Sequence, residues 1–433
     1  MSMTTIAVIG IIVMIVLILM GVNVSMALFI VGFFGFAAVV NFNAAFGMLR
    51  TVPFSQALTY SFVVIPLFIL MGQFAFLSGM STSLYSAAER WLSSVRGGLA
   101  LATIAACAAF SAICGSSGAT AATMGVVAYP EMKRFGYAPS LSSGSIAAGG
   151  TLGVLIPPST MFIIYGIISG ESIGRLFAAG VIPGLILMLC YMAAIVVLMR
   201  VKPEYAPDRK TYSWKERFVS LKGCIGFVVL FICVLGSIFT GIASATEAAA
   251  FGAFLALVLM IVNGQFTLKK FYQALIETLK TTAMMLLIIL GAMVFGYFLS
   301  ATRLPQLLNT MILDMHTSKY VVIFVIFLIY LVLGCIMDAV AMILITVPIF
   351  LPIVVSLGFS PIWFGVFCVL MQEVSMMTPP LGMNVFITKG ILKEVSLETV
   401  YKGVTPFVIG AVICVFIICA LPTLSLWLPG ILY

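Results

Sequence analysis

The stretch GGTLGVLIPPST, at residues 149–160, interrupts a long apolar run with glycines and a pair of prolines. SMMTPPLGMNVF, at residues 375–386, does the same in the second half of the chain. Glycine frees the backbone to leave helical dihedral angles and proline removes an amide donor, so a helix is expected to unwind at both places. Unwound backbone at membrane depth is tolerated only where it is buried in protein or lines a cavity. Two interrupted membrane helices, 141–168 and 361–390, are therefore predicted.

The composition sets the class of protein around these two helices. Of the 433 residues, 63% are hydrophobic and 8% are charged, against about 25% charged residues in soluble domains. Apolar runs of the roughly 20 residues that a membrane span needs recur along the chain. We expect an all-α polytopic membrane protein. The net charge of +8 is explained by an asymmetry of its loops, and nucleic acid is not expected as a partner.

Two further apolar stretches, 98–130 and 318–352, have polar or glycine-rich centres. The first contains CGSSGATAATMG at 114–125, and the second contains LGCIMD at 333–338. Each is too long for one span and short for two. A re-entrant hairpin, entering and leaving on one side of the membrane, fits both stretches.

The order of these features repeats with an offset of about 220 residues, which indicates an internal duplication. We expect a first repeat at 1–200, with scaffold helices at 3–78, hairpin 98–130 and unwound helix 141–168. A cytoplasmic linker follows at 201–222. The second repeat, 223–433, is expected to contain scaffold helices at 223–300, hairpin 318–352, unwound helix 361–390 and a last span at 403–427. With five spans in each repeat, the second is inverted relative to the first, as in secondary transporters.

The basic residues support one orientation in the membrane. With both termini periplasmic, four basic residues fall on the outer side, Arg50, Arg175, Arg303 and Lys319, and the rest of the 21 fall on the cytoplasmic side. This distribution satisfies the positive-inside rule. Amphipathic segments at 81–95, 266–280 and 393–402 are expected to lie flat at the interface.

The helix interruptions are also the candidate binding sites. Each exposes carbonyl oxygens that can coordinate a hard cation, and creates helix amino-termini that attract a carboxylate. One cation site per repeat is expected, where tip 115–118 meets the break at 153–158 and where tip 334–338 meets 378–382. Three acids are predicted inside the membrane, Glu247, Asp338 and Glu373, and Asp338 lies in a tip where a cation ligand is expected. The alternative is that the glycines and prolines are kinks or packing contacts.

The sequence contains no H-E-x-x-H, G-x-S-x-G or G-x-x-x-x-G-K-[ST] motif. No set of residues in it therefore indicates a membrane enzyme. Without a phosphate-binding loop, the driving force is expected from an ion gradient or from a partner.

The chain resembles the large membrane subunit of tripartite ATP-independent periplasmic (TRAP) transporters. The resemblance rests on PLFILMG at 66–72, GSSGAT at 115–120, GVLIPPS at 153–159, GIASATEAAAFGA at 241–253, MDAVAMILITVPIFLPI at 337–353 and TPPLGMNVF at 378–386. It implies a static scaffold and a moving transport domain that work as an elevator in the bacterial inner membrane. It also implies Na+ as the coupling ion, a periplasmic substrate-binding protein, a small four-helix membrane subunit and an organic-acid substrate such as sialic acid or a C4-dicarboxylate.

The resemblance further implies which residues bind. Sodium would be held by Ser116, Ser117, Gly118, Gly153, Ile156 and Pro158 in the first repeat, and by Gly334, Asp338, Thr378 and Leu381 in the second. Substrate would lie near Ser117, Thr120, Pro158, Ser159, Pro380 and Asn384. A stand-alone sodium/anion symporter of the divalent-anion type is the main alternative, and an ion channel with re-entrant loops is another.

Overall fold

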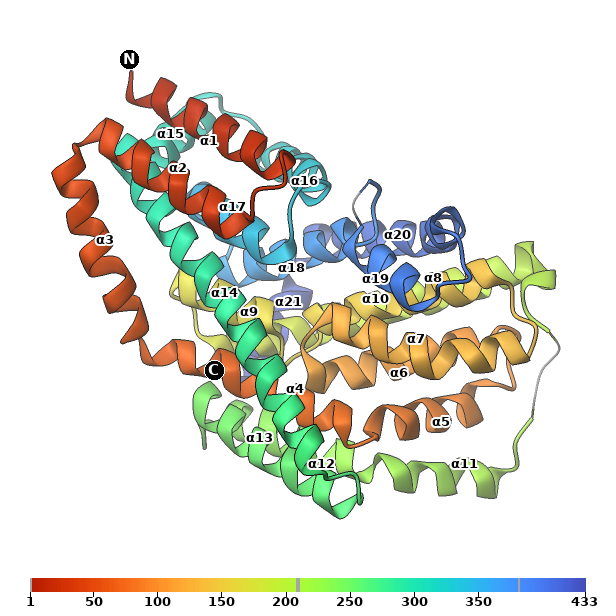
Figure 1. Cartoon of the computed structure of the whole chain (residues 1–433). Helices are drawn as coiled ribbons and strands as arrows, with labels where there is room; N and C mark the ends of the chain where they lie inside the picture. The colour runs from red at the N-terminus through yellow and green to blue at the C-terminus, as the bar shows by residue number, and fades with distance from the viewer. Residues whose placement is uncertain (1, 208–210, 381) are drawn as a thin grey trace.

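The computed structural model describes residues 2–207, 211–380 and 382–433 (Figure 1). The described residues form helices, turns and loops, and no strand occurs among them. Eight of their helical segments are long and apolar enough to cross a membrane. The expectation of an all-α polytopic membrane protein is confirmed.

The first half of the chain runs from α1 to α10. Its helices are α1 (Met3–Leu19), α2 (Val24–Val39), α3 (Phe42–Ala57), α4 (Val64–Leu77), α5 (Met80–Leu92), α6 (Gly98–Cys114), α7 (Ser117–Arg134), α8 (Pro139–Leu155), α9 (Thr160–Ser169) and α10 (Ile173–Val201). A short helix, α11 (Trp214–Leu221), lies in the linker. Single 3-10 turns are found at Tyr60–Val63, Pro203–Tyr205 and Lys222–Cys224.

The second half runs from α12 to α21. Its helices are α12 (Ile225–Phe239), α13 (Ala245–Val262), α14 (Leu268–Thr302), α15 (Leu304–Asp314), α16 (Lys319–Gly334), α17 (Ala339–Ser356), α18 (Pro361–Ser375), α19 (Met383–Ile391), α20 (Leu397–Ala420) and α21 (Thr423–Leu432).

The two halves have helix-capping residues and prolines at corresponding points of their helices. Ser116 is the N-cap of α7, and Asp338 is the N-cap of α17. The sequence offset between Ser116 and Asp338 also separates four prolines of the first half from four prolines of the second. In this way Pro130, Pro139, Pro157 and Pro158 correspond to Pro352, Pro361, Pro379 and Pro380. The helix pairs α6/α7 and α8/α9 thus correspond to α16/α17 and α18/α19. The opposite orientation of the halves in the membrane stays a prediction.

Each hairpin begins and ends at one end of the molecule. In the first, the Leu99 amide donates to the Tyr137 hydroxyl at 3.2 Å, so the start of α6 lies beside the end of α7. In the second, the rings of Tyr320 and Phe359 are 6.3 Å apart, which places the start of α16 beside the residues that follow α17. Both geometries are those of a chain that turns back on itself at its tip.

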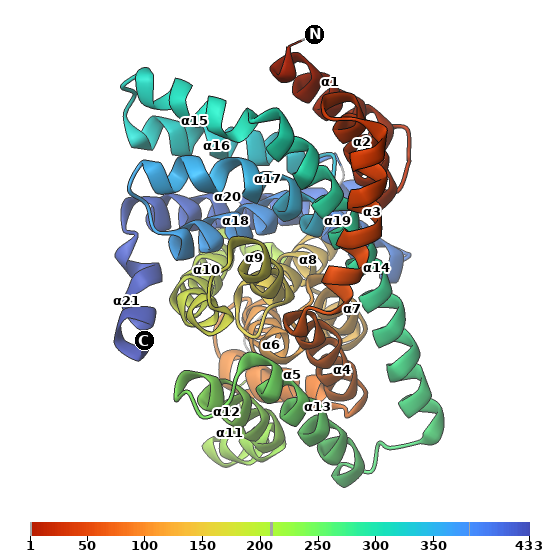
Figure 2. The same cartoon turned by 90° about the vertical axis from the view of Figure 1, so that its left-hand side faces the viewer.

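The halves interlock through their interrupted helices. Helix α7 packs against α19 of the other half, and α17 packs against α9. A Cβ atom added to Gly118 of α7 would lie 2.9 Å from Cδ1 of Ile387 in α19, so the small residue permits the close approach. Figure 2 shows the resulting layers, with α16/α17 above, α6/α7 below, and α8, α9, α18 and α20 between them.

Helices α2, α4, α13 and α14 form a second group at the side of these layers. Helix α14 contacts α2 and α4, and α4 contacts α13. Helix α14 is continuous over 35 residues, or about 52 Å at 1.5 Å per residue. The expectation of a separate flat segment at 266–280 is therefore wrong, because 268–280 belongs to a continuous helix that has no proline, and no glycine before Gly291.

Two other expectations also need correction. The last span was expected at 403–427, but α20 ends at Ala420 and α21 follows, since Pro422 disfavours helical dihedral angles at Leu421. Segment 393–402 is no separate element, because Leu397 onwards is the first part of α20. Glu247 lies at the molecular surface in the first turn of α13, where it completes a capping box with Ser244, and its expected position inside the membrane stays a prediction.

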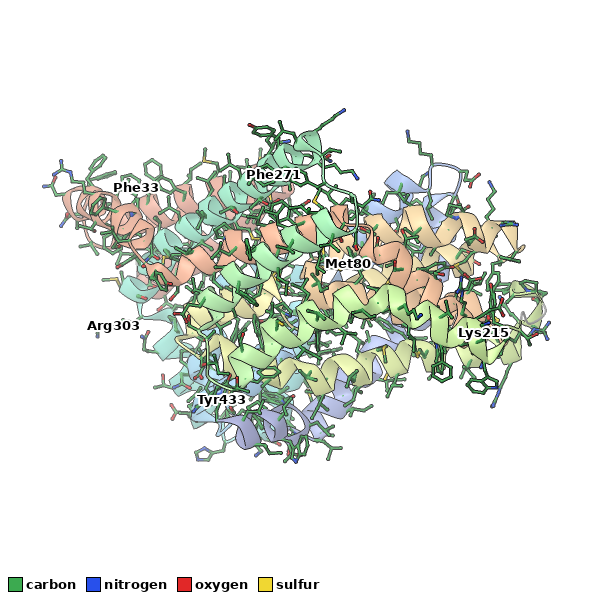
Figure 3. The ribbon with its side chains drawn as sticks, turned by 90° about the horizontal axis from the view of Figure 1, so that it is seen from below. Phe33, Met80, Lys215, Phe271, Arg303 and Tyr433 are labelled. Carbon is green, nitrogen blue, oxygen red and sulfur yellow. The ribbon has the colours of Figure 1, made fainter. Side chains whose placement is uncertain are left out.

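Basic residues that were assigned to opposite sides of the membrane lie at different ends of the molecule. Figure 3 shows Lys215 of the linker at one end and Arg303 toward the other. The linker helix α11 packs against α5, where Trp91 Nε1 donates to the Arg217 carbonyl at 3.2 Å. The separation of Lys215 from Arg303 fits the charge asymmetry of the sequence, and the assignment of each end to one side of the membrane stays a prediction.

Candidate functional site

The first tip closes directly onto the first helix break. Gly115 ends α6 with a φ of 59°, a left-handed conformation that glycine adopts readily. A Cβ atom there would lie 2.9 Å from the Pro158 carbonyl oxygen. Across the same contact, Thr160 Oγ1 donates to the Gly115 carbonyl at 3.0 Å. The tip and the break are thus held together by close packing and a hydrogen bond.

Backbone oxygens gather at the first junction, which is the contact between tip 115–118 and the break at 153–158. Pro157 has no amide hydrogen, so the Gly153 carbonyl, one turn earlier, has no donor in its own helix. A Cβ atom on Gly153 would lie 3.1 Å from the Ser116 carbonyl oxygen, which places the break against the tip. Ile156 lies in the same break, where it packs against Gly184 of α10. Carbonyl oxygens of unwound helices are typical ligands of Na+ in transporters.

The hydroxyl groups at the first junction mostly form hydrogen bonds with nearby backbone groups. Ser116 caps α7 by accepting from the Ala119 amide, and Thr120 Oγ1 donates to the Ser116 carbonyl at 2.9 Å. Ser159 caps α9 and donates to the Val154 carbonyl, whose helical donor is removed by Pro158. Ser117 is buried beside them at the start of α7. These bonds fix the geometry of the tip.

The second tip approaches its break in the same way. Gly334 packs against the Ser375 side chain so closely that a Cβ atom would overlap it. Cys335 Sγ donates to the Pro379 carbonyl at 3.2 Å, and Gln372 Nε2 donates to the Ala339 carbonyl at 2.8 Å. The expected pairing of each tip with the break of its own half is present in both halves.

Asp338 is the acidic group of the second junction, which is the contact between tip 334–338 and the break that follows α18. Its Oδ1 accepts from the Ala341 amide at 2.9 Å and caps α17. No ion pair involves Asp338 among the described residues. It lines a cavity of about 370 Å³, whose wall also includes Gly334, Ser375 and Val24 of α2. A half-buried carboxylate without a basic partner, facing a cavity, suits a cation.

The break of the second half is longer and more open than that of the first. Thr378 Oγ1 donates to the Val374 carbonyl at 2.7 Å, so this hydroxyl belongs to the end of α18. Pro380 is exposed, and its carbonyl accepts from the Tyr401 hydroxyl at 2.9 Å. Leu381, the remaining expected ligand, lies outside the described residues.

Asn384 brings the second break to the first half. It is fully buried, and its Nδ2 donates to the Ala147 carbonyl of α8 at 3.4 Å. Its Oδ1 accepts no hydrogen bond from any described residue. A buried amide oxygen without a donor is costly, so it marks a place where a ligand or water can bind.

The structure also brings together three buried polar groups, of which the sequence singled out Glu373 alone. Thr151 Oγ1 and the Tyr191 hydroxyl are 3.0 Å apart between α8 and α10. Glu373 of α18 lies close to both groups, and it is fully buried. Neither carboxyl oxygen of Glu373 has a hydrogen-bond partner of standard geometry among the described residues. Thr151 and Glu373 are separated by the same sequence offset as the paired prolines. This correspondence can be read from the sequence alone.

The family model of the tripartite ATP-independent periplasmic transporter, DctM component, matches residues 11–424. The chain belongs to this DctM family of TRAP transporter large membrane subunits. The resemblance noted from the sequence motifs is confirmed.

Several DctM-family proteins are similar over most of their length. The C4-dicarboxylate TRAP transporter large permease protein DctM of Pseudomonas aeruginosa is 35% identical over 86% of both chains. The sialic acid TRAP transporter large permease protein SiaM of Vibrio cholerae is 31% identical, again over 86% of both chains. The isethionate TRAP transporter permease protein DctMQ of Oleidesulfovibrio alaskensis is 32% identical, over 88% of this chain and 60% of its own length.

The fold of this DctM-family chain also occurs in a solved structure. The YdaH transporter of Alcanivorax borkumensis matches with a TM-score of 0.60 over 89% of both chains, at 16% sequence identity. At this level of identity the likeness shows a shared fold alone.

Proposed function

We propose that this large subunit is the membrane permease of a sodium-coupled importer of small organic anions. The observation that carries the proposal is the pair of tip-and-break junctions, one in each half. Helix breaks that meet in the middle of a membrane protein supply carbonyl ligands for cations and helix amino-termini for an anion. The organic-acid class is supported by the named substrates of the relatives, C4-dicarboxylates, sialic acid and isethionate.

The proposed sodium sites are the two junctions. Ser116, Gly153 and Pro158 offer oxygens at the first, with Ser117, Gly118 and Ile156 beside them. Gly334, Asp338 and Thr378 form the described part of the second. The fit rests on the Gly153 carbonyl, which has no helical donor, and on Asp338, which has no basic partner among the described residues.

The proposed substrate site lies where the halves interlock. Asn384 and Pro380 come from the second half, and Ser117, Thr120, Pro158 and Ser159 come from the first. The orphaned Asn384 Oδ1 supports a polar ligand here. Sodium bound on either side would offset the charge of the anion, which couples the binding of the two.

The proposed transport cycle is an elevator movement. The interlocked hairpins and interrupted helices would move as one body against the group formed by α2, α4, α13 and α14. Val24 of α2 lines the Asp338 cavity, so the scaffold forms one wall of the site and such movement would open it. A small four-helix membrane subunit and a periplasmic substrate-binding protein are the proposed partners, and the bacterial inner membrane is the proposed location with both termini periplasmic.

Uptake into proteoliposomes tests the proposal. The chain is reconstituted with its proposed small subunit, and radiolabelled organic acids are offered with the proposed binding protein. We expect saturable uptake that needs both an inward Na+ gradient and the binding protein. Sodium-driven uptake without the binding protein would favour the stand-alone symporter, and flux without saturation would favour a channel.

A further inference from the structure

A groove on the outer face of α10 and α20 lies away from both junctions. It has a volume of about 740 Å³ and is walled mostly by apolar side chains of the two helices. On α10 the lining residues Cys190, Ala194, Val197 and Val201 recur at helical spacing, so they form one stripe. On α20, Ile409 and Ile413 line the facing wall. The groove thus runs along the helices.

Small residues create the space. Gly410 lets α20 approach α10, because a Cβ atom there would lie only 3.3 Å from the Cys190 carbonyl oxygen. Ala193 and Ala194 of α10 also line the groove without filling it. The rims are open to the surroundings, since Val197 is 59% and Ile409 is 57% exposed. An apolar groove with apolar rims, on a membrane helix, faces lipid.

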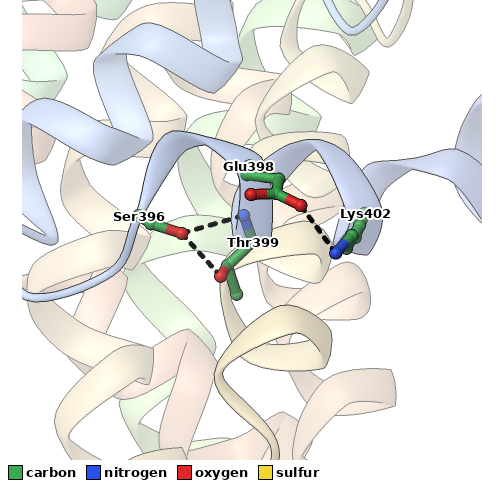
Figure 4. Close-up of polar contacts among 4 residues, drawn as sticks. All are labelled: Ser396, Glu398, Thr399 and Lys402. Atoms are coloured by element: carbon green, nitrogen blue, oxygen red, sulfur yellow. Dashed lines mark hydrogen bonds and ion pairs between the residues drawn. The ribbon is translucent and has the colours of Figure 1, made fainter.

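One end of the groove is basic. Lys202, the C-cap of α10, and Lys402 of α20 both line it. Lys202 Nζ donates to the Tyr205 hydroxyl at 3.1 Å, and Lys402 Nζ lies 2.7 Å from Glu398 (Figure 4). Lys402 and Glu398 are both more than 70% exposed, and such surface pairs contribute little. Lys402 can therefore exchange this partner for another anion.

The length of the groove matches one leaflet. From Cys190 to Val201 the helix rises about 17 Å. Half of the hydrocarbon core of a bilayer is about 15 Å. The basic end therefore lies at the depth of the lipid headgroups when the apolar part lies among the acyl chains. By the distribution of basic residues, this is the cytoplasmic leaflet, which carries anionic lipids.

We propose that this groove binds a phospholipid with an anionic headgroup, its acyl chain along α10 and α20 and its phosphate between Lys202 and Lys402. The lipid joins the end of the first half to the end of the second, because α10 and α20 are the corresponding helices of the two halves. Charge complementarity and leaflet length favour a lipid over a protein helix as the occupant.

Native mass spectrometry of the purified full-length complex, titrated with phosphatidylglycerol or phosphatidylcholine, tests the headgroup contact. The double variant Lys202→Gln/Lys402→Gln is expected to weaken phosphatidylglycerol binding about 25-fold, or roughly fivefold for each lysine near an anionic lipid. It should leave phosphatidylcholine binding nearly unchanged. Lys269→Gln/Lys270→Gln, the matched control on α14, removes the same charge away from the groove and is expected to have no effect. An equal loss in both double variants overturns the proposal.

The acyl-chain contact is tested separately. Ala194→Trp fills the groove and is expected to abolish retention of both lipids, whereas Leu189→Trp, on the exposed side of the same helix, is expected to retain them. Loss of the small subunit from the Ala194→Trp complex, with lipid binding intact, would show a protein-docking surface instead. Full competition of phosphatidylglycerol by inorganic phosphate would show a free-phosphate site. Either result overturns the proposal.

Discussion

The two tip-and-break junctions share a backbone plan and differ in charge and openness. At the first, Ser116 caps the helix after the tip, and the tip is closed onto the break by the bond from Thr160 to Gly115. At the second, Asp338 occupies the corresponding position and lines a cavity of about 370 Å³. The difference shows that two elements with the same backbone plan can differ in the charge of the capping side chain and in the space beside it.

The largest difference between the junctions is expected from the carboxylate. In Asp338→Asn the cap is kept, because Asn is as good an N-cap as Asp, but the charge is lost. A carboxylate about 4 Å from a cation contributes several kcal/mol even when partly screened. We expect the Na+ concentration for half-maximal uptake to rise roughly 100-fold. Ser116→Ala, the matched change, is expected to raise it by less than about tenfold, since it removes a cap alone. An unchanged sodium dependence in Asp338→Asn would remove this residue from the site.

The next effect concerns the backbone of the first tip. Gly115→Ala places a Cβ atom in the left-handed region and 2.9 Å from the Pro158 oxygen. The expected loss is about 3 kcal/mol from strain and overpacking together. Gly136→Ala is the control, because Gly136 has a φ of 74° but no atom within 4 Å of its Cβ position. It is expected to cost about 1 kcal/mol. Thermal unfolding of the purified variants measures both, and equal losses would contradict the closure of the first tip onto its break.

A smaller effect is expected from the bonds that link each tip to its break. Thr160→Val removes the hydrogen bond to Gly115 and is expected to cost about 1 kcal/mol. Cys335→Ala removes the corresponding bond to Pro379 and is expected to cost less, because a thiol is a weak donor. The melting temperatures of the two variants rank the bonds. A larger fall in Cys335→Ala would reverse the assignment of the first junction as the tighter one.

The smallest effect is a pH dependence at the water-exposed end of the first hairpin. Lys133 of α7 lies 2.5 Å from Glu394, which follows α19, and this hydrogen bond lowers the pKa of the Glu394 carboxyl. The stabilisation is therefore present above the ordinary carboxyl pKa of about 4.3 and is lost as the pH falls through the lowered value. Both side chains are exposed, so the effect is slight. The melting temperature of the wild type should exceed that of Glu394→Gln at neutral pH and equal it in acid. A difference that persists in acid would exclude the ion pair as its source.

Local chemistry explains which parts of this arrangement were predictable. Pro157, Pro379 and Gly115 act on the backbone within one helical turn, so the breaks and the first tip could be located from the sequence. The bonds from Thr160 to Gly115 and from Tyr401 to Pro380 could not, because they join residues that only the packed helices bring together. The same holds for the burial of Glu373 beside Thr151 and Tyr191.

The continuity of α14 shows another limit of the sequence. Residues 266–280 mix lysines with aromatic residues, which is typical of an interfacial segment, and 281–300 are apolar. The change of composition was interpreted as a boundary between two elements. In the structure the helix continues through it, because a polar first part needs only to extend beyond the membrane.

Sodium-specific stabilisation of the purified chain tests the central claim most directly, since it needs neither the substrate nor the partners. The melting temperature is measured as NaCl replaces choline chloride or KCl at constant ionic strength, in the wild type and in Asp338→Asn. We predict a saturable rise of the melting temperature with Na+ in the wild type that K+ and choline do not reproduce, and a much weaker rise in Asp338→Asn. Equal melting temperatures in Na+, K+ and choline would contradict the assignment of the two junctions as sodium sites.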